Sequence, residues 1–197
     1  MHALRCELPI HEQAEERIRY LSYYDVLTGL PNRQCLKERL DQSLRETRRH
    51  GGHVAVLFID LDRFKEINDN FGHGEGDRLL RLVAERVNNC VRGSDAVSRT
   101  ESGHACFTVS RQGGDEFTVM LTRLKSPEHA GRVAERMLNE LRKPFALAGR
   151  EVRVGASIGI SVAPGDGADV ETLLKHADMA MYQAKLSGRD GFLFVSP

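Results

Sequence analysis

The chain alternates between segments with helical and with strand-like spacing of apolar residues. Residues 54–59 form a continuous apolar run, typical of a strand buried on both faces, and the run stops at Asp60. A polar, glycine-rich stretch at 63–77 lies between the predicted elements. The other expected helices are 10–24, 33–49, a segment ending near 91, 127–141 and 170–186, and the other strands are 106–111, 117–121, 152–162 and 192–195. This order predicts an α/β fold with a central, mostly antiparallel sheet flanked by helices.

Length and charge narrow the class of protein. The 197 residues suit one domain with a short extension, which we place at 25–197 and 1–24. The 28 basic and 28 acidic residues give a net charge of zero, which argues against a nucleic-acid partner. Four scattered cysteines, no signal peptide and no apolar run of membrane-spanning length favour a cytoplasmic segment without direct membrane contact. A neighbouring segment could still tether it to a membrane.

Two aspartates mark a candidate metal site. Asp60 ends the buried strand, and Asp115 lies in a Gly113-Gly114 hairpin turn between two further predicted strands. If these strand ends are neighbours, the two carboxylates suit Mg²⁺ held jointly with substrate phosphates. From spacing alone, ordinary surface acids explain them equally well. The glycines permit positive φ and close approach of a ligand, but they also fit a plain β-turn.

Two further pairs of polar residues could bind a nucleotide. Asn68 and Asp77 can match the donors and the acceptor on the edge of guanine, although Asp77 could instead cap the following helix. Lys185 and Arg189 lie four residues apart near a helix end, where they could bind terminal phosphates. Compensation of the helix dipole explains these cations as well.

Taken together, several segments resemble the GGDEF family in the right order, over about residues 24–196. The matching segments are Asp25 to Arg33 (DVLTGLPNR), Asp60 to Asp69 (DLDRFKEIND), Gly72-His73, Gly76-Asp77, Gly113 to Phe117 (GGDEF), Ser157 to Ile160 (SIGI), and Ala177-Asp178 through Tyr182 to Lys185 and Gly188-Arg189.

The resemblance implies a fold like the palm of nucleotide cyclases and polymerases, and it assigns roles to residues. Asp60, Asp115 and the carbonyl of Leu61 would bind Mg²⁺ or Mn²⁺. The catalytic residues would be Asp60, Asp115 and Glu116, with Asp115 and Glu116 helping to activate the 3′-hydroxyl. The substrate-binding set would be Asn68 and Asp77 for guanine, Lys65, Lys185 and Arg189 for phosphates, and His73, Gly113 and Gly114 in the adjoining motifs.

A diguanylate cyclase is the function that this resemblance implies. Two GTP would give cyclic di-GMP and two pyrophosphates, with one GTP in each half of a homodimer. The alternative is a catalytically silent module that binds GTP or cyclic di-GMP. The N-terminal helix resembles the linker that often follows a PAS sensor, and an EAL domain often begins where this chain ends. We therefore expect a piece of a larger signalling protein.

One departure from the family pattern concerns an inhibitory product site. Arg92 and Asp95 match an Arg-x-x-Asp motif, and Arg136 matches a supporting arginine, but about twelve extra residues near 100–111 separate this motif from the hairpin. Either the insertion loops out and residues 95–99 lead to the hairpin, or 107–111 replace that strand and carry Arg92 away from Arg136. An even insertion can preserve which face points inward, so we favour the looped-out insertion and a working site.

Overall fold

The computed structural model describes residues 18, 20–92 and 107–195. A five-stranded sheet with the order β2-β3-β1-β6-β7 forms its centre, and only the β6–β7 pair is parallel. The predicted α/β class and mostly antiparallel sheet are thus confirmed. The elements are α2 (Arg33–His50), β1 (His53–Leu61), α3 (Phe64–Phe71), α4 (His73–Arg92), β2 (Phe107–Gly113), β3 (Glu116–Leu124), α5 (Glu128–Leu141), β4 (Phe145–Leu147), β5 (Arg150–Val152), β6 (Ala156–Ala163), α6 (Val170–Leu186) and β7 (Gly191–Phe194).

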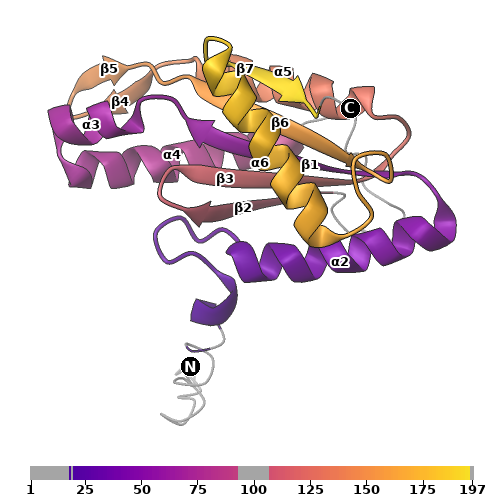
Figure 1. The fold of residues 1–197 in the computed structure, drawn as a ribbon. Coiled ribbons are helices and arrows are strands. Elements are labelled where there is room, and N and C mark those ends of the chain that lie inside the picture. The colour runs from indigo at the N-terminus through magenta and orange to yellow at the C-terminus, as the bar shows by residue number, and fades with distance from the viewer. Residues whose placement is uncertain (1–17, 19, 93–106, 196–197) are drawn as a thin grey trace, which may run out of the picture.

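Strand β1 is buried on both faces because helices cover each side of the sheet. Its residues 55, 57, 59 and 61 pack into one apolar core with α4 and α5, whereas 54, 56 and 58 pack into a second core with α2 and α6. Figure 1 shows α2 and α6 on one face of the sheet and α4 on the other. This double burial explains the continuous apolar run in the sequence, since neither face of the strand meets water.

A single glycine brings α6 close to the sheet. A Cβ on Gly159, in the centre of β6, would lie 2.0 Å from the carbonyl oxygen of Ala177 and 2.1 Å from the amide nitrogen of Met181. Because both contacts are to the helix backbone, no side-chain rotation could relieve them. The close packing fixes the middle of α6 against β6, and Lys185 lies in the last turn of the same helix.

Two parts of the predicted layout are wrong. The stretch 63–77 lies outside every element predicted from the sequence, but it contains α3 and the first turn of α4. The predicted strand 152–162 is divided between β5, which belongs to a separate two-stranded sheet, and β6. The break lies at residues 153–155, where the carbonyl of Gly155 accepts a hydrogen bond from the amide of Asp62 at 2.9 Å and so turns away from the β4–β5 ladder.

Residues 20–23 are helical, in agreement with the end of the predicted N-terminal helix, and most of that prediction falls outside the described residues. No helix within the described ranges is long and apolar enough to cross a membrane.

Candidate active site

The predicted metal-binding acids come together at the end of β1. Asp60 is the strand's penultimate residue, only 7% exposed, and its register partner in β3 is Glu116. The amide of Leu61 donates to the carbonyl oxygen of Asp115 at 3.4 Å, so the hairpin turn adjoins the strand end. Antiparallel pairing therefore places Asp60, Leu61, Asp115 and Glu116 together, as the sequence predicted on the condition that the strand ends are neighbours.

Burial, together with the neighbouring negative charges, raises the pKa of two of these acids. Burial is the main cause for Asp60, and the negative charges of Asp115 and Asp62 add to it, while Lys185 opposes the shift. Burial also raises the pKa of Glu116, with further contributions from Asp60 and the nearby Asp178. Both pKa shifts have the same physical origin, because burial and nearby like charges disfavour the ionised form of a carboxyl group. The site would gain stability from a cation.

Lys185 supplies one such cation. Its Nζ atom lies 2.7 Å from Oδ2 of Asp60, and its side chain is 27% exposed. Lys185 is in the last turn of α6, which crosses the sheet beside β1 (Figure 1). Four residues later, Arg189 lies exposed in the turn between α6 and β7. Both predicted phosphate ligands thus flank one turn, and one of them contacts a metal-site acid. Compensation of the helix dipole alone does not account for that contact.

The residues expected to read guanine lie on α3 and α4. Asn68 is partly buried, and a Cβ on Gly76 would lie 1.9 Å from its Oδ1 atom, so the Asn68 amide packs directly on the backbone of α4. Asp77 is exposed, and α4 begins at His73, four residues before it. The alternative that Asp77 caps this helix is therefore wrong, which leaves its carboxylate available for a ligand. Lys65, in the first turn of α3, and His73 are both exposed.

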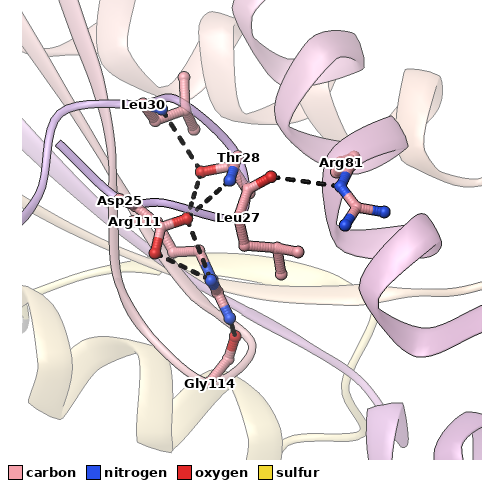
Figure 2. A network of polar contacts seen from close by, with 7 residues as sticks. All are labelled: Asp25, Leu27, Thr28, Leu30, Arg81, Arg111 and Gly114. Atoms are coloured by element: carbon pink, nitrogen blue, oxygen red, sulfur yellow. Dashed lines mark hydrogen bonds and ion pairs between the residues drawn. The ribbon is translucent and has the colours of Figure 1, made fainter. Parts of the chain in front are cut away.

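A network of polar contacts, which the sequence did not predict, holds the backbone of the β2–β3 hairpin (Figure 2). Arg111, in β2, donates to both carboxylate oxygens of Asp25 at 3.0 Å and to the carbonyl oxygen of Gly114 at 2.7 and 3.1 Å. Asp25 also accepts from the amide and hydroxyl of Thr28. The family-like segment 25–33 is thus a structural clamp on the hairpin. Its resemblance to the family was a signal that it mattered, but the partner in β2 was not evident.

The strand leading into the hairpin corrects our prediction about the insertion. The strand predicted at 106–111 from the apolar pattern is confirmed as β2 (Phe107–Gly113), which pairs along its length with β3. The favoured alternative, in which residues 95–99 lead into the hairpin, is therefore wrong. With β2 at 107–113, Arg92 was expected to lie away from Arg136. However, Arg136 donates through Nη2 to the carbonyl of Cys90, two residues before Arg92 on α4, so it contacts the same end of that helix. Arg92 is exposed at the end of that helix, and Asp95 lies outside the described residues.

The donor set suits a hard divalent cation shared with phosphates. The described residues contain no group of three or more His, Cys, Asp or Glu side chains arranged to hold a metal ion. They do bring together Asp60, Asp115 and Glu116, where burial and then the neighbouring negative charges raise the pKa of Asp60 and Glu116. A site with few protein carboxylates, completed by substrate oxygens, matches the way Mg²⁺ is commonly bound beside phosphates.

Comparison with known proteins agrees with this geometry. The family model described as "Diguanylate cyclase, GGDEF domain" matches residues 22–191, so the chain belongs to the GGDEF family. The diguanylate cyclases of this family generally depend on a divalent metal. The GGDEF domain of TpbB (YfiN) from Pseudomonas aeruginosa is a similar solved structure, with a TM-score of 0.80, 39% identity, and coverage of 88% of this chain and 95% of that one.

The curated relatives are longer proteins whose names give different activities. The chain is 42% identical over 182 residues to the bifunctional diguanylate cyclase/cyclic di-GMP phosphodiesterase MucR of Pseudomonas aeruginosa, covering 92% of this chain and 25% of MucR. It is 40% identical over 185 residues to the cyclic di-GMP phosphodiesterase NbdA of the same organism, covering 94% of this chain and 22% of NbdA. The chain thus spans about a quarter of the length of these relatives.

Proposed function

We propose that this chain is a diguanylate cyclase domain that converts two GTP into cyclic di-GMP and two pyrophosphates. The observation that carries the proposal is the cluster of Asp60, Asp115 and Glu116 at one strand end, with Lys185 bonded to Asp60. Family membership supports it, and a curated relative named diguanylate cyclase TpbB is 40% identical over 173 residues. The activity of a longer protein that contains this chain is part of the same proposal.

The chain's residues divide the work of the reaction. Asn68 and Asp77 bind the guanine edge, and Lys185, Arg189 and Lys65 neutralise the phosphates. The 3′-oxygen of one GTP attacks the α-phosphorus of the other, the bond to the β-phosphate oxygen breaks, and pyrophosphate leaves. The hydroxyl proton passes to a carboxylate of the hairpin. Glu116 is suited to accept it because burial raises the pKa of Glu116 and makes it a stronger base than an ordinary glutamate.

A divalent cation held by Asp60, Asp115 and the carbonyl of Leu61 would lower the pKa of the attacking hydroxyl and stabilise charge on the phosphates. We propose Mg²⁺ or Mn²⁺ in this role. Because one domain binds one GTP and the product has two-fold symmetry, two copies must face each other, so the active form is a homodimer. GTP is the substrate and cyclic di-GMP the product. We place the reaction in the cytoplasm, where GTP is made.

The direct test is to incubate the chain with GTP and Mg²⁺ and measure cyclic di-GMP. We expect product from the wild type and none from Asp60→Asn or Asp115→Asn, with circular dichroism unchanged. Near-normal turnover by either variant would rule out the two-carboxylate site. A protein that binds GTP but makes no product would instead be a catalytically silent binding module, which is the second candidate function. The relative NbdA, named as a phosphodiesterase, is the observation that favours this candidate.

Base selectivity gives a second test of the proposal. The N1 and amino group of adenine reverse the donor and acceptor pattern that Asn68 and Asp77 can match. A site built to hydrogen-bond one base rejects an analogue strongly, because buried polar groups are then left without partners. We expect calorimetry to detect GTP binding and no ATP binding at equal concentrations. Similar affinities would contradict the assignment of these two residues.

A further inference from the structure

The turn after α6 holds Arg189 in an uncommon main-chain conformation. Arg189 and Asp190 have φ angles of 65° and 46°, in the left-handed region that residues with side chains rarely adopt. Such conformations persist only where the surrounding structure fixes them. The contacts that fix this turn converge on Asp190 and come from two residues far apart in the sequence, Arg142 and Asp62.

The first contact comes from Arg142, the C-cap residue of α5. Its Nε atom donates to both carboxylate oxygens of Asp190, at 2.9 and 3.1 Å, and its Nη2 atom donates to the Asp190 main-chain carbonyl at 2.9 Å. One guanidinium thus holds both the side chain and the backbone of the residue next to Arg189. This planar, multiple contact is one that lysine could not reproduce.

The second contact comes from Asp62, two residues beyond the metal-site Asp60. One oxygen of Asp62 accepts the amide N–H of Asp190 at 2.9 Å, and the other accepts the hydroxyl of Ser157 at 2.7 Å. The space around it is limited, since a Cβ on Gly155 would lie 2.9 Å from Asp62 Oδ2. Both carboxylate oxygens of Asp62 therefore bind groups of the protein. Asp62 thus has a structural role, unlike Asp60, which belongs to the candidate metal site.

We propose that Asp62 and Arg142 are positioning residues that fix the turn carrying Arg189, and so select for the terminal phosphates of a guanine nucleotide. The inference rests on the proposed function, in which Arg189 and Lys185 bind those phosphates. Within the described residues, the Arg189 guanidinium makes no hydrogen bond or ion pair, while its amide donates to Ala184 at 3.1 Å. Its backbone is held and its charged group remains available, which is the arrangement a phosphate ligand needs.

The test compares the affinities of GTP and GMP for the 197-residue chain by calorimetry. GMP retains the guanine contacts but lacks the β- and γ-phosphates. In Arg142→Ala we expect GTP affinity to fall about tenfold, with GMP affinity changed by less than about twofold, because only charge-assisted phosphate contacts are lost. Arg142→Lys should restore little, since it lacks the planar fork. Lys143→Ala is the matched control, because Lys143 is the next residue and, among the residues that the structure describes, its side chain pairs only with Glu140.

Amide hydrogen exchange of the nucleotide-free protein supplies a second readout. Exchange at residues 189 and 190 should rise in Arg142→Ala and in Asp62→Asn, and stay at the wild-type level in Lys143→Ala. Unchanged exchange in Arg142→Ala, or an equal loss of GTP and GMP affinity, would overturn the positioning role. A wild type that binds GTP no better than GMP would count against the proposed function instead, and the exchange result would still decide whether these residues hold the turn.

Discussion

The guanidinium of Arg111 donates to both carboxylate oxygens of Asp25 at 3.0 Å, across 86 residues of sequence. Both side chains are largely buried, with exposures of 11% and 21%. Burial alone would raise the pKa of Asp25, but hydrogen bonds from Thr28 and the contact with Arg111 outweigh it and lower that pKa. The pair joins the segment that follows the N-terminal helix to the hairpin that carries Asp115, because Arg111 also holds the Gly114 carbonyl (Figure 2).

We expect this pair to stabilise the domain strongly for a single contact. Arg111→Ala should lower the free energy of unfolding by about 2 kcal/mol, because a partly buried carboxylate then loses its cation. A double-mutant cycle with Asp25→Ala, measured by urea denaturation, should give a coupling energy of about 1 to 2 kcal/mol. Strictly additive single effects would show that the two groups act separately.

The pKa of Glu116 is raised on folding, whereas that of Asp25 is lowered, so ionised Glu116 should destabilise the folded protein. Its pKa is raised in the folded protein, so the folded state binds more protons than the unfolded state between the ordinary glutamate pKa, about 4.3, and the raised value. The contribution of Glu116 to the free energy of unfolding is therefore least favourable at pH values above its raised pKa. Glu116→Gln should stabilise the protein at pH 7 by about 0.5 kcal/mol, a modest figure because the group is only partly buried. The gain should shrink towards pH 4.

Urea denaturation at pH 7 and pH 4 measures this difference. Glu135→Gln, at an exposed position on α5 outside the acid cluster, is the matched control for the substitution itself. A Glu116→Gln variant that is less stable than wild type at pH 7 would contradict the crowding of acids at this site.

Product inhibition remains a prediction for the end of α4. Arg92 is exposed there, and Arg136 of α5 bonds to the carbonyl of Cys90 on the same helix. We expect cyclic di-GMP to bind with Arg92, Asp95 and Arg136 and to inhibit turnover. Arg92→Ala should weaken binding at least about tenfold, since an arginine fork to phosphate is lost. Calorimetry with Arg132→Ala as the control tests this, and equal binding by wild type and Arg92→Ala would oppose it.

The sequence predicted those parts of the site that follow from strand ends. The apolar run at 54–59 predicted a strand buried on both faces, and the Gly113-Gly114 turn predicted a hairpin. Asp60 and Asp115 were therefore expected to lie together if the strands paired. Helix α3 was not predicted because its eight residues include Asn68, Asp69 and Asn70, which have low helix propensity. The start of α4 was not predicted because of the glycines at 72, 74 and 76.

Contacts that polar side chains make with residues far away in the sequence could not be predicted in this way. Asp62 reaches Asp190 across 128 residues, and Arg111 reaches Asp25 across 86. Neither pair produces a periodic pattern, because each depends on the register of strands and on how turns pack against them. The segment that leads into the hairpin was ambiguous for another reason, since Val97-Ser98-Arg99 and Val109-Ser110-Arg111 are the same three residues. The apolar pattern at 106–111 indicated the correct one, and the pairing with β3 confirms it.

Gly76 offers a sharp test of the guanine site, because its backbone lies directly against Asn68. A Cβ at this position would come within 1.9 Å of Asn68 Oδ1 and 3.3 Å of the Phe64 ring. Gly76→Ala must therefore displace the Asn68 amide, while alanine itself favours the helix. We expect GTP affinity to fall at least about tenfold, as buried polar groups of the base lose their partners. Gly74→Ala, in the same first turn with nothing within 4 Å, should bind GTP normally. Calorimetry on both variants decides the matter, and equal affinities would mean that Asn68 does not read the base.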